Sequence, residues 1–161
     1  MNFQAGDAVM HWAYGLGTII RLEKREVLGQ AAMYYAVKVG DMMVWVPADD
    51  KLKRRLRPPT SKARFKKLLE QLTAPGEPLP MDRHERKLKL SETLQDGKAE
   101  SLVNVIRSLG AFALIHALND NDQAFLKRAR SLLAGEWGYA LSITPAEAEF
   151  KLQHILTPAT A

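Results

Sequence analysis

The stretch from residue 3 to residue 47, FQAGDAVMHWAYGLGTIIRLEKREVLGQAAMYYAVKVGDMMVWVP, decides the fold of the first part of this chain. Short runs of apolar, β-branched and aromatic residues alternate with polar ones, and glycines separate the runs. Gly15 and Gly17 allow the backbone angles of a tight corner between two strands. Pro47 ends the sheet, because proline has no amide hydrogen for a central ladder. The pattern predicts a small, strongly bent, five-stranded β-barrel.

Four strands of this barrel can be placed from the same runs. We expect strands at residues 8–10, 18–22, 33–39 and 42–46, and a turn at 25–29 that is approached by charged residues. Trp12 lies in this region and is expected to be structural.

The chain changes character near residue 56, where period-two alternation gives way to apolar residues at helical spacing. Pro58-Pro59 is the natural linker, so we expect one domain at 1–57 and a second at 58–161. The second domain should be a bundle of five helices, which makes the chain an α+β protein. The first helix is expected to begin at Thr60 or Ser61 and to end at Pro75-Gly76. The others are expected at 82–97, at about 98–118, after residues 119–122, and at 146–156.

Capping residues and apolar spacing add detail to these helices. Thr60 or Ser61 can cap the first helix and Asp82 the second. In the second helix Leu88, like the other leucines, should face inward. The apolar run at 110–115 should be a buried part of the third helix, with Ile115 and Leu118 in the core. Trp137, in the fourth helix or just after it, is expected to be structural.

Catalytic and metal-binding motifs do not stand out in this sequence. The chain has no cysteine, so it has no disulfide, thiol nucleophile or cysteine-bound zinc. The four histidines are scattered without ligand spacing, and no phosphate-binding glycine motif is present. The Gly15-Leu16-Gly17 run lacks the third glycine of a dinucleotide site. We therefore expect a protein that is not an enzyme and needs no cofactor or metal.

Membrane and targeting signals are also lacking. The longest apolar run is far shorter than the roughly 20 residues that span a bilayer. The first residues lack the basic and apolar regions of a signal peptide. We expect a cytoplasmic protein with no membrane partner.

Basic residues concentrate in the middle of the chain. Between residues 51 and 89 there are 13 Lys and Arg residues and four Asp and Glu residues, a local charge of +9, while the rest of the chain carries −4. This distribution is expected if one face of the protein meets a polyanion. The alternative is that these cations simply coat solvated helix faces.

The ordered set of these features resembles the CarD/CdnL family of bacterial transcription regulators, whose N-terminal domain also occurs in the transcription-repair coupling factor. The barrel residues quoted above carry most of the resemblance. The helical part adds Glu77-Pro78 before a basic helix, the LQDG run at 94–97 and the LKRARSLLAGE run at 126–136. The resemblance implies a Tudor-like barrel that docks on the β subunit of RNA polymerase.

The resemblance places this docking surface on the strand at 42–46. There, alternation turns Val44 and Val46 inward and turns Met43 and Trp45 outward. Trp45 stands where relatives often carry an arginine that contacts the β subunit, so it is either an aromatic anchor or part of the barrel core. The polymerase-binding residues expected in this sequence are Arg25, Met43, Trp45 and Pro47. The alternative to a binding role for Arg25 is that it is a solvated arginine of the hairpin.

The second surface implied by the resemblance is the basic helix after Pro80. Relatives place there a tryptophan that wedges into the minor groove at the upstream edge of the transcription bubble, and this chain has Met81 at that position. Met81 could be a weaker wedge or could lie in the core beneath the helix start. The DNA-binding residues expected here are Met81, Arg83, Arg86, Lys87 and Lys89. Phosphate contacts by the basic residues would give salt-sensitive binding with little sequence specificity.

The combined expectation is a monomeric transcription regulator that binds polymerase and promoter DNA together and thereby stabilises the open complex, so it would be associated with the nucleoid. Two alternatives remain. In the first, the helical domain binds another protein and the chain is a polymerase-binding adaptor. In the second, the barrel is a free-standing nucleic-acid binder, which predicts tight DNA binding without polymerase.

Overall fold

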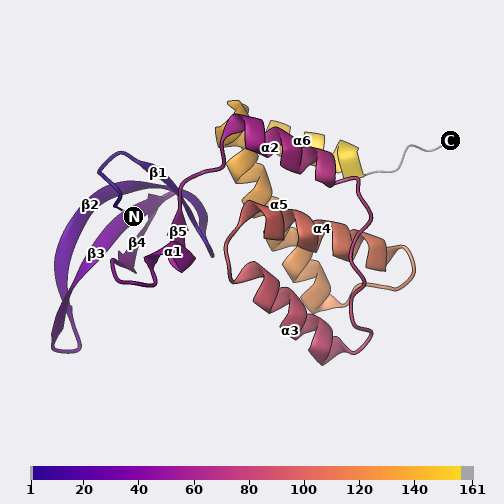
Figure 1. Cartoon of the computed structure of the whole chain (residues 1–161), viewed down its shortest axis with the longest axis horizontal. Coiled ribbons are helices and arrows are strands. Elements are labelled where there is room, and N and C mark those ends of the chain that lie inside the picture. The colour runs from indigo at the N-terminus through magenta and orange to yellow at the C-terminus, as the bar shows by residue number, and fades with distance from the viewer. Residues whose placement is uncertain (1, 157–161) are drawn as a thin grey trace. The chain divides into compact units, whose positions relative to one another are not determined.

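The computed structural model of the chain describes residues 2–156 and divides into two compact units, Met1–Pro59 and Thr60–Ala161 (Figure 1). The first unit holds a five-stranded sheet and the second holds helices, so the α+β class is confirmed. The elements of the first unit are β1 (Ala8–His11), β2 (Gly15–Val27), β3 (Gln30–Val39), β4 (Met42–Pro47), α1 (Leu52–Arg55) and β5 (Leu56–Arg57).

The sheet has the order β4-β3-β2-β1-β5, and all of its ladders are antiparallel. In the described residues no ladder joins the two end strands, β4 and β5, so the sheet is not closed and the predicted barrel is not confirmed. β5 is only two residues long, and the short helix α1 occupies part of the segment between the two end strands. The sequence analysis did not predict α1.

The core of the first unit lies on one face of the sheet. Its buried members are Val9, Ile19, Tyr35, Val37, Val46, Leu52 and Leu56. The two glycines of the first corner have different roles. Gly15 has the positive φ of +87° that the prediction required. Gly17 lies within β2 without a positive φ, and a Cβ there would come within 2.8 Å of Val39 Cγ2 and 2.9 Å of the Lys38 oxygen. Close approach between strands therefore explains Gly17 better than turn geometry.

Strand β2 is longer than the sequence pattern predicted. It continues through Arg25 to Val27, so the expected turn at 25–29 shrinks to Leu28 and Gly29. Charged residues are tolerated in this strand because both of its faces are exposed toward its end.

The second unit contains five helices, so the described chain has six in all rather than the five predicted. These helices are α2 (Lys62–Gln71), α3 (Arg83–Leu94), α4 (Ala99–Ala113), α5 (Asp120–Leu141) and α6 (Pro145–Leu156). Helix α5 contacts each of the other four. The core contains Trp137, which is confirmed as structural, together with Phe65, Leu90, Leu109, Leu133 and Leu152. None of the helices in residues 2–156 is long and apolar enough to cross a bilayer.

The helix starts follow the predicted caps. Ser61, rather than Thr60, accepts a hydrogen bond from the Arg64 amide at 3.3 Å, and Asp82 accepts one from the Glu85 amide at 3.0 Å. At α5, Asn119 and Asp122 form a capping box.

The end of α4 and one side of α3 differ from the prediction. Helix α4 ends at Ala113, and the following Leu114 and Ile115 are 81% and 79% exposed instead of buried. Leu118 is only partly buried, and Leu88 on α3 is exposed. Apolar periodicity in the sequence indicates which residues could be buried. It does not show whether the unit provides a surface to bury them.

Candidate functional site

Strand β4 forms one end of the sheet, and its ladder with β3 fixes which backbone groups are available there. Just beyond β4, the Ala48 amide donates a hydrogen bond of 2.9 Å to the Met33 carbonyl on β3. Because bonded and non-bonded pairs alternate along an antiparallel ladder, Met43, Trp45 and Pro47 direct their backbone groups away from β3. Arg55 Nη1 donates to the outward Pro47 carbonyl at 3.4 Å. The strand edge open to a partner is therefore Met43–Trp45.

A charged and aromatic cluster covers one face of the sheet beside this edge. We call Arg21, Glu23, Arg25 and Trp45 the Trp45 cluster. The Trp45 indole N–H donates to the Glu23 carboxylate, and the Arg25 guanidinium lies 4.3 Å from the centre of the Trp45 ring. Arg21 Nε and Arg25 Nη1 lie 3.0 and 3.7 Å from the Glu23 carboxylate oxygens. The cluster spans three strands, since the Glu23 and Trp45 strands both flank β3.

A small residue makes this reach across the sheet possible. Ala36 on β3 pairs with Arg21 on one side and with Trp45 on the other, and it is fully buried. Its methyl group leaves room for the indole of Trp45 to lie toward β2. The hydrogen bond from Trp45, followed by the one from Arg21, lowers the pKa of Glu23 below the usual glutamate value of 4.5. Glu23 is therefore a carboxylate at neutral pH and holds both the indole and the arginines.

The structure places Trp45 on the outer face, 38% exposed, so it is not part of the core. It brings Trp45 and Arg25 into direct contact, whereas Met43 is half-buried. Sequence reasoning missed Arg21 and Glu23. Their signal was present, because residues 21, 23 and 25 share one face of a strand by alternation. This shared face was not recognised, because the predicted strand at 18–22 ended before residues 23 and 25.

The second surface predicted from the sequence starts at the N-terminus of α3. Arg83, Lys87 and Lys89 are exposed there. Arg83 and Lys87, with His84, line a polar hollow of about 350 Å³. The other side of this hollow is the start of α5, formed by Asn119, Asp120 and Asn121. Lys89 Nζ donates to the Pro78 carbonyl at 3.1 Å and so also fastens the loop before α3.

Arg86 was predicted to lie on the outer, DNA-facing side of α3, and the structure corrects this. The residue is 4% exposed, and its guanidinium makes two parallel hydrogen bonds to Asp122, Nε to Oδ1 at 2.8 Å and Nη2 to Oδ2 at 3.0 Å. It also lies 4.6 Å from the centre of the Phe112 ring. Arg86 is thus occupied inside the unit and is not available to a phosphate.

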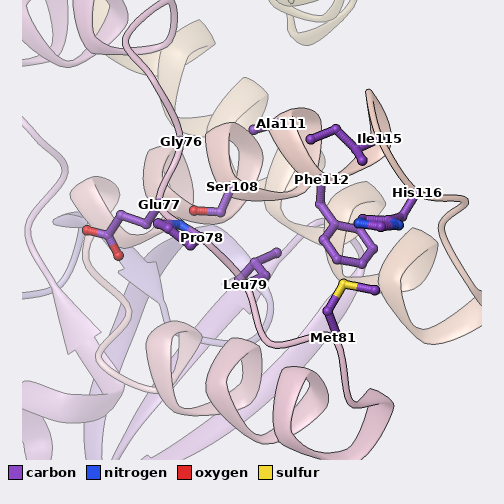
Figure 2. A pocket seen from close by; sticks show the side chains of 10 residues that line it. All are labelled: Gly76, Glu77, Pro78, Leu79, Met81, Ser108, Ala111, Phe112, Ile115 and His116. Atoms are coloured by element: carbon purple, nitrogen blue, oxygen red, sulfur yellow. The ribbon is translucent and has the colours of Figure 1, made fainter.

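Met81 lies in the loop before α3 at the edge of an apolar hollow. The hollow has a volume of about 300 Å³, and Figure 2 shows the Met81 side chain pointing toward Phe112 and His116 inside it. Met81 is 63% exposed, so it is not the core residue that was one of the alternatives. Arg86 Nη1 donates to the carbonyls of Pro80 and Met81, both at 3.1 Å, and thereby fixes the backbone at Met81.

The part of the chain that the structure describes contains no metal-binding cluster. No group of three or more His, Asp or Glu residues there could hold a metal ion. The arrangement offers contact surfaces, an open strand edge with an aromatic anchor in one unit and a basic, partly apolar helix start in the other.

Comparison with known proteins adds to this description. Residues 3–59 match the family model described as the CarD-like/TRCF RID domain, which confirms the resemblance predicted from the sequence. A protein of Bacillus subtilis (strain 168), named "Putative transcription factor YdeB", is 25% identical over 145 residues, which cover 88% of this chain and 94% of that protein. The similarity to this relative therefore extends through both units.

Proposed function

We propose that this chain, whose residues 3–59 form a CarD-like/TRCF RID domain, is a transcription regulator that docks on the β subunit of RNA polymerase and contacts promoter DNA upstream of the melted region. The observation that carries the proposal is the open edge of β4 with Trp45 exposed beside it. We further propose that the protein acts as a monomer, without catalysis and without a cofactor.

Docking would occur by addition of a polymerase strand to β4. Outward backbone donors and acceptors at Met43 and Trp45 can pair with an extended partner segment. Side chains of that segment would then lie near the Trp45 indole, the kind of aromatic residue that often dominates an interface. The Trp45 cluster holds two arginines and one glutamate, so it has a net positive charge that favours an acidic partner surface.

DNA contact would use the start of α3. Arg83 and Lys87 are exposed on this helix and can each neutralise a phosphate, while Lys89 is a third, more constrained candidate. Met81 is an exposed apolar side chain that could press against a base step in the minor groove. Bound to polymerase and to DNA at once, the protein would slow the collapse of the bubble. Weak DNA affinity is sufficient, because polymerase supplies a high effective concentration.

The test measures the lifetime of promoter open complexes formed by the cognate RNA polymerase. We expect the protein to lengthen this lifetime, and we expect Trp45→Ala and the double variant Arg83→Ala with Lys87→Ala each to remove most of the effect. The matched control is Lys66→Ala with Lys67→Ala, which removes the same charge from exposed positions on α2. An equal loss in this control would contradict a specific contact at α3.

A polymerase-binding adaptor is the second candidate, and the apolar surface near Met81 favours it. Leu114 and Ile115 are strongly exposed, and Ile115 lines the same hollow as Met81. Exposed apolar patches often mark protein interaction sites. Confirmed polymerase binding with no change in open-complex lifetime would exclude DNA stabilisation and favour this candidate.

A further inference from the structure

The β2–β3 hairpin extends beyond every other strand of its sheet. The β1 ladder with β2 ends at Thr18, and the β4 ladder with β3 ends at Tyr34. The ribbon beyond these points and beyond the Met33–Ala48 hydrogen bond, residues 25–32, forms ladder hydrogen bonds only with itself, and Figure 1 shows it projecting past β4. All of its residues are exposed. A two-stranded ribbon without cover adds little to stability, so its length calls for another explanation.

The turn at the tip of this ribbon carries an unfavourable residue. Its two central residues are Leu28, with φ +53°, and Gly29, with φ +79°. Turns of this kind need positive φ at both positions and favour Asn-Gly or Asp-Gly. A leucine in the left-handed region is strained by contact between its Cβ and the following carbonyl.

Burial does not compensate for this strain, because Leu28 is 99% exposed. Neither local conformation nor packing within the unit explains a leucine here. Strained residues that fold stability does not explain are often found at functional sites. An apolar side chain held out at the end of a ribbon can gain free energy only by contact with another molecule.

The tip is continuous with the surface proposed for polymerase. Arg25 stacks on Trp45, and Val27 shares the face of Arg25 by alternation. Leu28 follows three residues after Arg25, about 10 Å along the strand. A standard interface buries about 800 Å² on each partner and covers this distance.

We propose that Leu28 is a second anchor for RNA polymerase and inserts into an apolar pocket of the subunit that adds its strand to β4. The inference rests on the proposed function and extends it, since it assigns the partner a pocket beside the added strand. Strand addition at β4 would set the orientation, and the tip would contribute apolar contact.

The experiment measures the affinity of the full chain for RNA polymerase without promoter DNA, together with thermal unfolding. Leu28→Asn creates the preferred Asn-Gly turn, so we expect an equal or higher melting temperature and a loss of affinity of about tenfold, which corresponds to burying one leucine side chain. Leu28→Met keeps an apolar side chain and should keep most of the affinity. Met33→Gln, on the opposite face of the same hairpin, is the control and should bind like the wild type.

The possible outcomes separate this inference from the proposed function. Absence of binding by the wild-type chain would overturn both. Wild-type binding that Trp45→Ala weakens and Leu28→Asn leaves unchanged would overturn the second anchor alone. A lower melting temperature for Leu28→Asn would overturn the argument from strain. Weaker binding by a folded Leu28→Asn variant, with Leu28→Met still binding, would support the inference.

Discussion

The guanidinium of Arg86 joins three other segments of the helical unit to α3. It pairs with Asp122 at the start of α5, donates to the carbonyls before α3 and lies against Phe112 of α4. Arg86 therefore supports from beneath the surface that we propose for DNA contact, because it fixes the backbone at Met81.

Removal of this side chain should be costly. We expect Arg86→Ala to lower the free energy of unfolding by about 3–5 kcal/mol, because it leaves the Asp122 carboxylate buried and uncompensated. The double variant Arg86→Met with Asp122→Asn should lose less, since no buried charge then remains unpaired and the Asn side chain can still accept the Asn119 amide hydrogen bond of the capping box. Arg83→Ala, at an exposed neighbouring position, should stay within about 0.5 kcal/mol of the wild type. Urea unfolding followed by helical circular dichroism measures all three, and a double variant less stable than the single one would contradict this account.

Arg86 and Trp45 show which side-chain positions can be predicted from local sequence patterns and which cannot. Helical spacing and charge placed Arg86 outside, because its partner Asp122 is 36 positions away and no local pattern links the two. Trp45 was placed correctly, since strand alternation is a local property with a period of two. Its contact with Glu23 could not be predicted, because that contact requires the strand order and the small Ala36 between them.

At the scale of elements, strand β4 and helix α4 illustrate the same limit. The limits of β4 were predicted almost to the residue, because apolar alternation defines the strand and Pro47 ends it. It predicted α4 five residues too long, to residue 118 instead of Ala113, because apolar periodicity continues past the last residue that finds a core. The predicted barrel is not confirmed for a similar reason, since closure of a sheet depends on a ladder between distant strands.

The edge of β4 can be tested with proline, which removes one amide hydrogen at a chosen position. Met43 directs its amide outward, so Met43→Pro should leave the sheet folded and weaken polymerase binding by roughly tenfold through one lost hydrogen bond and altered strand geometry. Val44 pairs inward with Val37, so Val44→Pro should destabilise the sheet by about 3 kcal/mol. Thermal unfolding and a polymerase affinity measurement separate the two variants. Unfolding by Met43→Pro together with a folded Val44→Pro variant would show that the ladder alternates in the opposite sense.

At the scale of the whole molecule, the proposed mechanism depends on the covalent connection between two units with different partners. The connection is short in sequence, since the first unit ends at Pro59 and Thr60 already belongs to the second. Thr60 is fixed there, because its amide and its hydroxyl both donate to Glu136 at 2.8 Å. The basic stretch at 51–89 spans this junction, so both units contribute cations near it in the sequence.

Lengthening this connection should therefore affect the open complex without affecting either contact surface. An insertion of about 12 Gly and Ser residues between Pro58 and Pro59 leaves the Thr60 contacts in place. We expect unchanged affinity for polymerase without DNA, and a several-fold shorter open-complex lifetime, because the effective concentration of the helical unit at the DNA falls with roughly the −3/2 power of linker length. The same residues appended after Ala161 are the control and should leave the lifetime unchanged. A lifetime that does not respond to the insertion would mean that the helical unit acts without being held near the DNA. That result would exclude the bivalent mechanism and would leave polymerase docking through β4 unaffected.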